Sequence, residues 1–261
     1  MSGWDDPATP VYYEAFCRAH DRYARANAAL IGHAGIAPGM RVLDLAAGTG
    51  RTAEAALARI GDGGRILCVE PAAAMRAMGQ RRLGDPRVAW CERLTEAAGP
   101  FDRILCGAAI WQMTPLDATI RDLSRLLAPG GALCFNIPAL YLCEPDEPGG
   151  GDDPLLLALP ARLAAEAAGE SETAAPSPPL ARGAIDAWLE EAGLRARSWT
   201  FRIPLTQAAY AEWLKIPVVN GRMLAGLAPE ERARRIDATL AAVDATGWKW
   251  ERWRGWTAWK S

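Results

Sequence analysis

The stretch MRVLDLAAGTGRTA, residues 40–53, decides the fold, because it passes from an apolar strand through a turn of small residues into a helix. Val42, Leu43 and Leu45 form the short apolar run typical of a strand buried on both faces of a parallel sheet, and Asp44 interrupts this run. Residues 46–50 are small enough for a ligand to approach the main chain. The segment 51–60 has apolar residues at helical spacing, and Gly61 stands at the expected C-cap. The stretch therefore predicts a ligand site built from a strand, a loop and a helix start.

Two classes of nucleotide-like cofactor use such a site. Gly48, Gly50 and Ala53 satisfy the loose G-x-G-x-x-A dinucleotide pattern, and Glu70 follows Gly50 by 20 residues, near the spacing of a ribose-binding acid. Asp44 separates the two classes, because the dinucleotide pattern requires no acid at that point of the strand. The observed order is acid, small residue, glycine, glycine.

The segment LDLAAGTG resembles motif I of the class I S-adenosylmethionine-dependent methyltransferases, whose usual form is D-x-G-x-G-x-G, with Ala46 in place of the first glycine. The resemblance implies that the cofactor lies against Asp44, Ala46, Gly48 and Gly50. It also implies that Glu70, at the end of a predicted strand over 65–69, accepts hydrogen bonds from both ribose hydroxyls. Such charge-assisted bonds contribute roughly 1.5–3 kcal/mol each.

Later segments follow the order of the same family. They are an acid-x-x-x-x-Met segment that packs beside adenine (70–75), VAWCERL (88–94), FDRILCGAAIW (101–111) and RLLAPGGALCFNIP (125–138). Residues 88–94 resemble the segment that recognises the adenine amino group. Residues 101–111 resemble the family's fourth strand and the loop after it, and residues 125–138 resemble a helix, a turn and the fifth strand. Trp90 stands where relatives often carry aspartate, so more aromatic adenine contacts are expected. The resemblance implies cofactor-binding roles for Pro71, Met75, Cys91, Glu92 and Cys106.

The fold class expected is α/β, with a Rossmann-like seven-stranded, mostly parallel sheet, an antiparallel last strand and helices on both faces. We expect a single domain over 1–261. Its parts are an N-terminal helical cap (1–37), a cofactor-binding core (38–137), a Pro-rich insertion (138–182) with a short helix at 155–168, and the C-terminal half of the sheet (183–261) with a helical lid at about 206–245.

The two ends of the chain are rich in aromatic residues. Residues 12–31 predict one amphipathic helix, which either packs on the sheet or closes over the methionine end of the cofactor. In the second interpretation Tyr12, Tyr13, His20 and Tyr23 point inward, with Tyr23 on the cofactor. Residues 248–261 predict a last strand inserted antiparallel between its two predecessors, with a bulge at Gly255. Its tryptophans either pack the sheet or form a cage for a cation.

Composition narrows the class of protein. Half of the 261 residues are apolar, enough for a sizeable core, and the net charge of −2 without a basic run argues against nucleic-acid binding. No run approaches the roughly 18 apolar residues of a membrane span, and residues 1–10 lack the features of a signal peptide, so we expect a cytoplasmic protein. The six cysteines form no C-x-x-C pair, and Cys68, Cys106 and Cys134 are expected to be reduced core residues rather than a metal site.

The expected mechanism depends on placement rather than on a strong base. The chain has two histidines, His20 and His33, and neither follows the predicted fourth strand. In-line alignment of a nucleophile with the methyl group can supply roughly 7–11 kcal/mol. If a proton must leave, the candidate catalytic residues are His20, Tyr13 and Tyr141. The candidate substrate contacts are Tyr12, Trp111, Gln112 and Trp213.

The function predicted is transfer of a methyl group from S-adenosylmethionine, with S-adenosylhomocysteine as product, to a small and partly apolar acceptor in specialised metabolism. The partners expected are the small-molecule substrate, with no nucleic acid and no membrane, for a monomer or homodimer. The acceptor atom, O, N, S or C, stays open. Alternatives are non-methyl chemistry on the same fold (cyclisation or decarboxylation), a non-catalytic cofactor-binding subunit, and a nicotinamide oxidoreductase.

Overall fold

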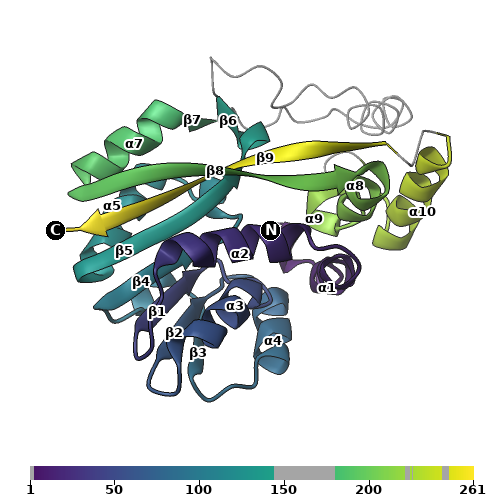
Figure 1. The fold of residues 1–261 in the computed structure, drawn as a ribbon. Coiled ribbons are helices and arrows are strands. Elements are labelled where there is room, and N and C mark those ends of the chain that lie inside the picture. The colour runs from purple at the N-terminus through teal and green to yellow at the C-terminus, as the bar shows by residue number, and fades with distance from the viewer. Residues whose placement is uncertain (1–2, 144–179, 221–223, 225, 243–246) are drawn as a thin grey trace.

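The computed structural model describes all residues except 1–2, 144–179, 221–223, 225 and 243–246. A seven-stranded sheet runs through the molecule in the order β3-β2-β1-β4-β5-β9-β8, and a separate two-stranded sheet pairs β6 with β7 (Figure 1). The strands are β1 (Arg41–Leu45), β2 (Arg65–Val69), β3 (Val88–Cys91), β4 (Phe101–Cys106), β5 (Leu127–Pro138), β6 (Leu142–Cys143), β7 (Leu180–Ala181), β8 (Leu194–Thr206) and β9 (Trp248–Lys260).

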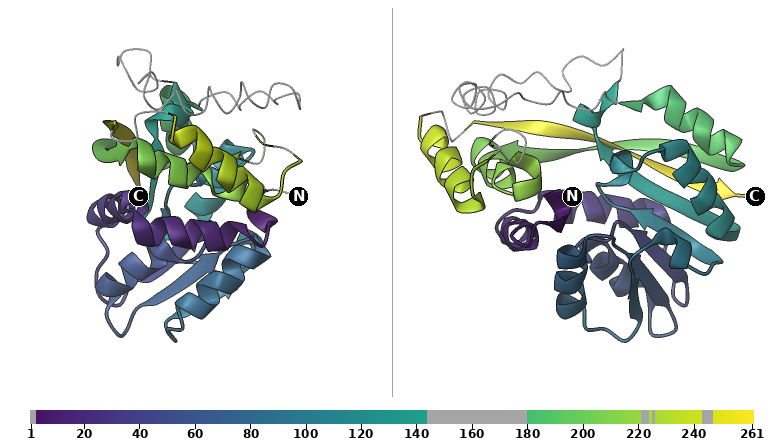
Figure 2. Two further views of the ribbon diagram at one scale, coloured as in Figure 1. Left: turned by 90° about the vertical axis from the view of Figure 1, so that its right-hand side faces the viewer. Right: turned by 180° about the vertical axis from the view of Figure 1, so that it is seen from behind.

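The helices cover the two faces and one end of the sheet (Figures 1 and 2). They are α1 (Thr9–Ala19), α2 (Arg22–Ala34), α3 (Arg51–Ile60), α4 (Ala73–Arg82), α5 (Leu116–Leu126), α7 (Arg182–Glu191), α8 (Gln207–Leu214), α9 (Pro217–Asn220) and α10 (Pro229–Leu240). The short 3-10 turns are η1 (Gly3–Asp5), η2 (Leu94–Glu96), η3 (Ile110–Gln112) and η4 (Ala139–Tyr141). Within the described part of the chain, no helix is both long and apolar enough to cross a membrane.

The core is built from strands that are apolar on both faces, as a parallel sheet between helices requires. On one face α5 and α7 pack on residues such as Leu43, Ile104 and Phe135. On the other face α2 and α3 pack on residues such as Val42 and Leu105. The predicted fold class is therefore confirmed, including the antiparallel β9 between β5 and β8.

The N-terminal segment differs from the prediction of one helix over 12–31. The chain forms two helices, because His20 adopts an extended backbone (φ −135°, ψ 141°) between α1 and α2. The two helices dock separately. Glu14 of α1 reaches the loop after β1, whereas Leu30 and Ile31 of α2 are buried against the sheet. A single straight helix would not direct both faces to these two surfaces.

The helical insertion after β8 lies beyond the ends of the parallel strands, beside α1 (Figures 1 and 2). Leu214 of α8, Leu224 and Ile236 of α10 form a small core of its own. Lys215 joins the insertion's helices, because its Nζ lies 2.6 Å from carboxylate oxygens of both Glu212 and Asp237. The helix predicted at 155–168 lies outside the described residues.

The bulge predicted at Gly255 is wrong. Gly255 pairs in continuous register with Asn136 of β5 and Trp199 of β8. Glycine is needed for a different reason, since a Cβ at this position would lie 2.2 Å from the Trp199 ring. That ring is fixed on its other side by a stack on His33, with centroids 4.0 Å apart.

Gly255→Ala is therefore expected to lower the free energy of unfolding by about 1–3 kcal/mol, the usual cost of overpacking a filled site. Gly183→Ala is the matched control, because an added Cβ there meets nothing within 4 Å. In the first turn of α7 that change should leave stability equal or raise it by up to about 1 kcal/mol. Urea denaturation of both variants checks the pair, and equal stability of the two would contradict the packing described.

Candidate functional site

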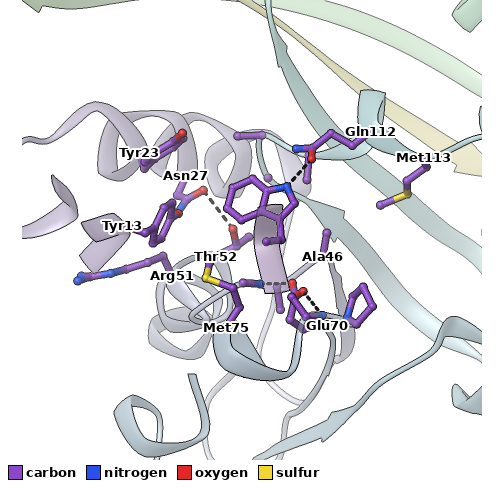
Figure 3. Close-up of a pocket in the computed structure, with 18 of the residues that line it drawn as sticks. Tyr13, Tyr23, Asn27, Ala46, Arg51, Thr52, Glu70, Met75, Gln112 and Met113 are labelled. Carbon is purple, nitrogen blue, oxygen red and sulfur yellow. Dashed lines mark hydrogen bonds between the residues drawn. The ribbon is translucent and has the colours of Figure 1, made fainter. Parts of the chain in front are cut away.

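A cavity of about 380 Å³ lies at the carboxyl ends of β1, β2 and β4 (Figure 3). This is the edge where parallel α/β sheets bind ligands. Its lining comes from η1, the N-terminal helices, the loop after β1, the segment after β2 and the loop after β4. The lining residues are Trp4, Asp5, Tyr13, Tyr23, Asn27, Ala46, Ala47, Gly48, Arg51, Thr52, Glu70, Pro71, Ala72, Met75, Gly107, Ala108, Ala109, Gln112 and Met113.

The loop after β1 takes a compact, partly left-handed path. The backbone N–H of Gly50 donates to the Ala47 carbonyl at 2.7 Å, and Ala46, Gly48 and Gly50 have φ values of 54°, 56° and 80°. Gly50 is tightly constrained, because a Cβ there would lie 2.5 Å from the Leu83 side chain. Ala46 accepts the left-handed conformation despite its methyl group, a strain that non-glycine residues seldom carry.

Glu70 holds the two halves of the cavity floor together. Its Oε2 accepts the backbone N–H of Gly48 at 2.7 Å, and its Oε1 accepts the N–H of Ala72 at 2.8 Å (Figure 3). The residue is only 6% exposed, and burial raises its pKa despite these two bonds. Each carboxylate oxygen has a further lone pair. Because Glu70 lines the cavity, those lone pairs are available to hydroxyl donors of a ligand.

Asp44 lies beneath the same loop without exposure to solvent. Neither of its oxygens makes a hydrogen bond within the described part of the chain. Burial raises the pKa of this carboxyl to about 8, although the backbone amide of Ala53 near the start of α3 favours the charged form. The group is therefore protonated at neutral pH in the structure as it stands.

Glu14 fastens the N-terminal helix α1 to the cavity. Its carboxylate accepts the Thr49 hydroxyl at 2.5 Å and the Arg51 guanidinium at 2.5 Å and 3.2 Å. Burial alone would raise its pKa, but the hydrogen bonds from Arg51 and Thr49 outweigh burial and the pKa is lowered. Glu14 is therefore a charged anchor between α1 and the start of α3.

Trp4 closes one side of the cavity from the N-terminal turn. Its indole Nε1 donates to Gln112 Oε1 at 2.7 Å, the bond drawn at Gln112 in Figure 3. The turn is held by the Thr9 hydroxyl, which donates to the Gly3 carbonyl at 2.8 Å. The indole thus spans from the N-terminal segment to the loop after β4, across the space that a ligand would enter.

Asn136 of β5 positions the loop after β4. Its Oδ1 accepts the N–H of Ala108 at 2.8 Å, and its Nδ2 donates to the Ala26 carbonyl of α2 at 2.9 Å. Gly107 passes so close to α2 and α3 that a Cβ would lie 2.6 Å from Thr52 Oγ1 and 3.0 Å from Asn27 Oδ1. One buried amide therefore fixes both walls of the cavity.

A buried polar cluster joins α2, α8 and β9 next to the cavity. Arg22 donates to both oxygens of Glu251 at 2.9 Å and 2.6 Å, and Trp253 Nε1 donates to the same carboxylate at 2.8 Å. Burial disfavours the charge on Arg22, but Glu251 outweighs it and the pKa is raised. The guanidinium lies 5.2 Å, 4.9 Å and 5.4 Å from the ring centroids of Tyr23, Trp213 and Trp253. A cage of aromatic rings thus exists, and the protein's own arginine fills it.

The structure brings part of the predicted site together. The predicted residues that line the cavity are Tyr13, Tyr23, Ala46, Gly48, Glu70, Pro71, Met75 and Gln112. Those that lie outside its lining are Tyr12, His20, Asp44, Gly50, Cys91, Glu92, Cys106, Trp111, Tyr141 and Trp213. Tyr23 nonetheless connects the two groups, because its hydroxyl accepts the Trp213 indole N–H at 3.0 Å.

The residues outside the lining have other partners. His20 ends α1 with its ring 5.1 Å from Phe16, and Trp111 stacks on Tyr141 at 4.6 Å. Glu92 forms an ion pair of 3.2 Å with Arg76. Cys91 donates weakly to a backbone carbonyl at 3.6 Å. Trp90 packs on α4, where a Cβ on Gly79 would lie 2.3 Å from its ring, and it does not line the cavity.

The tyrosines proposed as proton acceptors are poor bases as they stand. Burial raises the pKa of Tyr13 well above its usual range, and burial also raises the pKa of Tyr141. Both phenols are therefore neutral at physiological pH.

Sequence reasoning missed Trp4, Asn27, Arg51 and Thr52. Arg51 and Thr52 directly follow the quoted loop, and their position at the start of a helix was a usable signal. Trp4 and Asn27 carried no local signal, because their place in the wall depends on how the N-terminal segment folds over the sheet.

Residues 42–131 match the model of a family described as a methyltransferase domain. The ubiquinone/menaquinone biosynthesis C-methyltransferase UbiE of Bordetella parapertussis is 36% identical over 109 residues, 40% of this chain and 42% of that protein. The chain thus aligns with less than half of the length of this curated relative.

Two solved structures share the fold. The YcgJ protein from Bacillus subtilis superposes with a TM-score of 0.58 at 15% identity, covering 91% of this chain and 98% of that one. A phosphoethanolamine N-methyltransferase 2 of Haemonchus contortus, solved with phosphomonomethylethanolamine and S-adenosylhomocysteine, superposes with a TM-score of 0.52 at 17% identity. That match covers 90% of this chain and 52% of the Haemonchus chain.

The pKa of Asp44 predicts a pH-dependent stability. The folded protein holds a proton that the unfolded chain releases near pKa 3.8, so folding takes up a proton between about pH 4 and pH 8. This contribution makes the wild type less stable as pH rises through that window. Asp44→Asn removes it, so the stability of the variant relative to the wild type should increase between about pH 5 and pH 8.

Urea denaturation of the wild type and of Asp44→Asn at about pH 5 and pH 8 measures this difference in stability. The control is Asp102→Asn, which replaces a half-exposed aspartate. A difference between Asp44→Asn and wild type that stays constant or shrinks with rising pH would contradict a protonated Asp44.

Proposed function

We propose that this chain, which carries the methyltransferase domain of the class I S-adenosylmethionine-dependent family, transfers a methyl group from S-adenosylmethionine to a small, partly apolar acceptor. The observation that carries the proposal is Glu70, buried at the end of β2 and facing a cavity under a small-residue loop. The resemblance to this family implies a ribose-binding acid at this position.

The residues of the cavity fit the cofactor. The small side chains of Ala46 and Gly48 let a ligand contact backbone, and Met75 faces the cavity beside them. Glu70 retains lone pairs for two hydroxyl donors. Asp44, buried without a hydrogen bond, is a group that a cationic cofactor would stabilise in its charged form. The cavity volume of about 380 Å³ falls in the range of small-molecule sites.

When bound, S-adenosylmethionine supplies an activated methyl group. The chain's own residues bind the cofactor and orient the acceptor. Glu70 and the loop after β1 hold the nucleoside, while Arg51 is already neutralised by Glu14 and contributes shape more than charge. Tyr13, Tyr23 and Trp4 give the opposite wall an aromatic surface that excludes water and suits an apolar acceptor. Transfer then depends on alignment, with at most weak base assistance.

The relatives do not define the acceptor molecule of this chain. The family match ends at residue 131, before the insertion formed by α8, α9 and α10. Trp213 of that insertion contacts Tyr23 of the cavity wall, so the acceptor side is built from parts that lie beyond the matched domain. We infer that the insertion sets acceptor specificity, so the ubiquinone/menaquinone biosynthesis named for the Bordetella relative does not define the acceptor of this chain.

The test is calorimetric titration of Glu70→Ala with S-adenosylmethionine and S-adenosylhomocysteine. Loss of one charge-assisted bond of roughly 1.5–3 kcal/mol should weaken both affinities by about tenfold to 150-fold, and loss of both bonds to the ribose should weaken them by at least about a hundredfold. Glu96→Ala is the control, because Glu96 is exposed, lies on the turn η2 and pairs with Arg93, which is also outside the cavity.

Unchanged affinity in Glu70→Ala would reject the proposed cofactor site. Thermal unfolding of the variant separates loss of the ligand contact from loss of the loop, because Glu70 also bonds to Gly48 and Ala72. Release of S-adenosylhomocysteine by wild type in an acceptor screen, absent in a no-acceptor control, then tests methyl transfer itself.

A further inference from the structure

The hydroxyl group of Tyr23, in the cavity wall, keeps one hydrogen for a ligand. Its oxygen accepts the Trp213 indole N–H at 3.0 Å and, more weakly, Nη1 of Arg22 at 3.3 Å. Arginine and tryptophan side chains only donate, so these bonds use both lone pairs of the Tyr23 oxygen. Among the described residues no group accepts the hydroxyl hydrogen. Because Tyr23 lines the cavity, a ligand there can accept it.

Asn27 presents a second donor from the same face of α2. Residues four apart on a helix are neighbours, and Figure 3 shows Tyr23 and Asn27 together on one wall of the cavity. The Asn27 side chain is held in place, because its Oδ1 accepts the Thr52 hydroxyl at 3.1 Å and the residue is only 7% exposed. Within the described part of the chain its Nδ2 donates to no group. The amide N–H groups are therefore also available to a ligand.

Both donors are electrically neutral. Burial raises the pKa of Tyr23 by more than the nearby Arg22 and the Trp213 hydrogen bond lower it, so the phenol stays protonated at neutral pH and donates. The neighbouring cations are already paired, Arg22 with Glu251 and Arg51 with Glu14. Phosphate groups are typically bound by guanidinium or ammonium groups that carry a free charge. The neutral pair instead suits a single carbonyl or phenol oxygen.

We propose that Tyr23 and Asn27 form a two-donor site for an oxygen of the methyl acceptor, which is therefore a small compound with a carbonyl or phenol oxygen. This inference rests on the proposed methyl-transfer function. The bond from Trp213 places Tyr23 beside the insertion assigned above to the acceptor, whereas the nucleoside is assigned to Glu70. The Tyr13 ring, with its centroid 5.3 Å from that of Tyr23, offers the apolar part of the acceptor a surface beside the donors.

The experiment titrates the full chain, saturated with S-adenosylhomocysteine, with p-nitrophenol and with nitrobenzene, which lacks the phenol oxygen. Wild type should bind p-nitrophenol about tenfold or more tightly than nitrobenzene, the effect of hydrogen bonds to the phenolate oxygen. Tyr23→Phe should remove most of this preference. Asn27→Asp should also remove it, because the change keeps an acceptor for Thr52 and replaces the N–H donors with an oxygen. Tyr210→Phe is the control, since Tyr210 stacks on Trp213 outside the cavity lining.

Titration of the same preparations with S-adenosylhomocysteine separates the two ways to fail. Wild type that does not bind S-adenosylhomocysteine rejects the proposed function. Wild type that binds it but binds p-nitrophenol no better than nitrobenzene overturns the acceptor site alone, and this result needs no variant. An equal preference in Tyr23→Phe and Tyr210→Phe overturns the site as well. A loss of S-adenosylhomocysteine affinity in Tyr23→Phe as large as its loss of p-nitrophenol affinity would assign the donors to the cofactor and overturn the proposal.

Discussion

The rest of the site depends on the two hydrogen bonds that the Glu70 carboxylate accepts from backbone N–H groups. It takes one backbone N–H from the loop after β1 and one from the segment after β2, so a single side chain fixes the separation of two neighbouring loops. Buried charged groups are tolerated when such bonds are present. These two bonds leave carboxylate lone pairs of Glu70 facing the cavity. The same side chain therefore holds the two loops of the cavity floor together and can accept hydrogen bonds from a ligand.

The remaining walls depend on two further buried carboxylates. Glu14 ties α1 to Thr49 and Arg51, and Glu251 ties α2 to β9 through Arg22. Breaking one partner of such a pair leaves an uncompensated charge, so the N-terminal helices are held strongly in one arrangement. Trp213 contacts Tyr23 from the insertion. The cavity is thus assembled from the N-terminal segment, the central sheet, and the C-terminal insertion and strand.

Much of this could be predicted from local sequence. Helix α3 and strand β2 begin and end at the predicted residues, because Gly61 and the acid at Glu70 mark their limits. The break at His20 and the regular pairing of Gly255 could not be predicted from local sequence, because both depend on residues far along the chain. The break lets Glu14 of α1 bind Thr49, and Gly255 makes room for the ring of Trp199. The same limit explains why Trp4 was missed, whereas Glu70 and Met75 were found from motif spacing.

The central claim is that Glu70 holds a nucleoside while keeping both of its backbone bonds. A crystal structure of the chain soaked or co-crystallised with S-adenosylhomocysteine tests it most directly. We expect ribose hydroxyls within hydrogen-bond distance of Glu70, with the N–H groups of Gly48 and Ala72 still donating to its carboxylate. Ribose bound elsewhere, or a Glu70 side chain turned away from the loop to reach the ligand, would contradict the account.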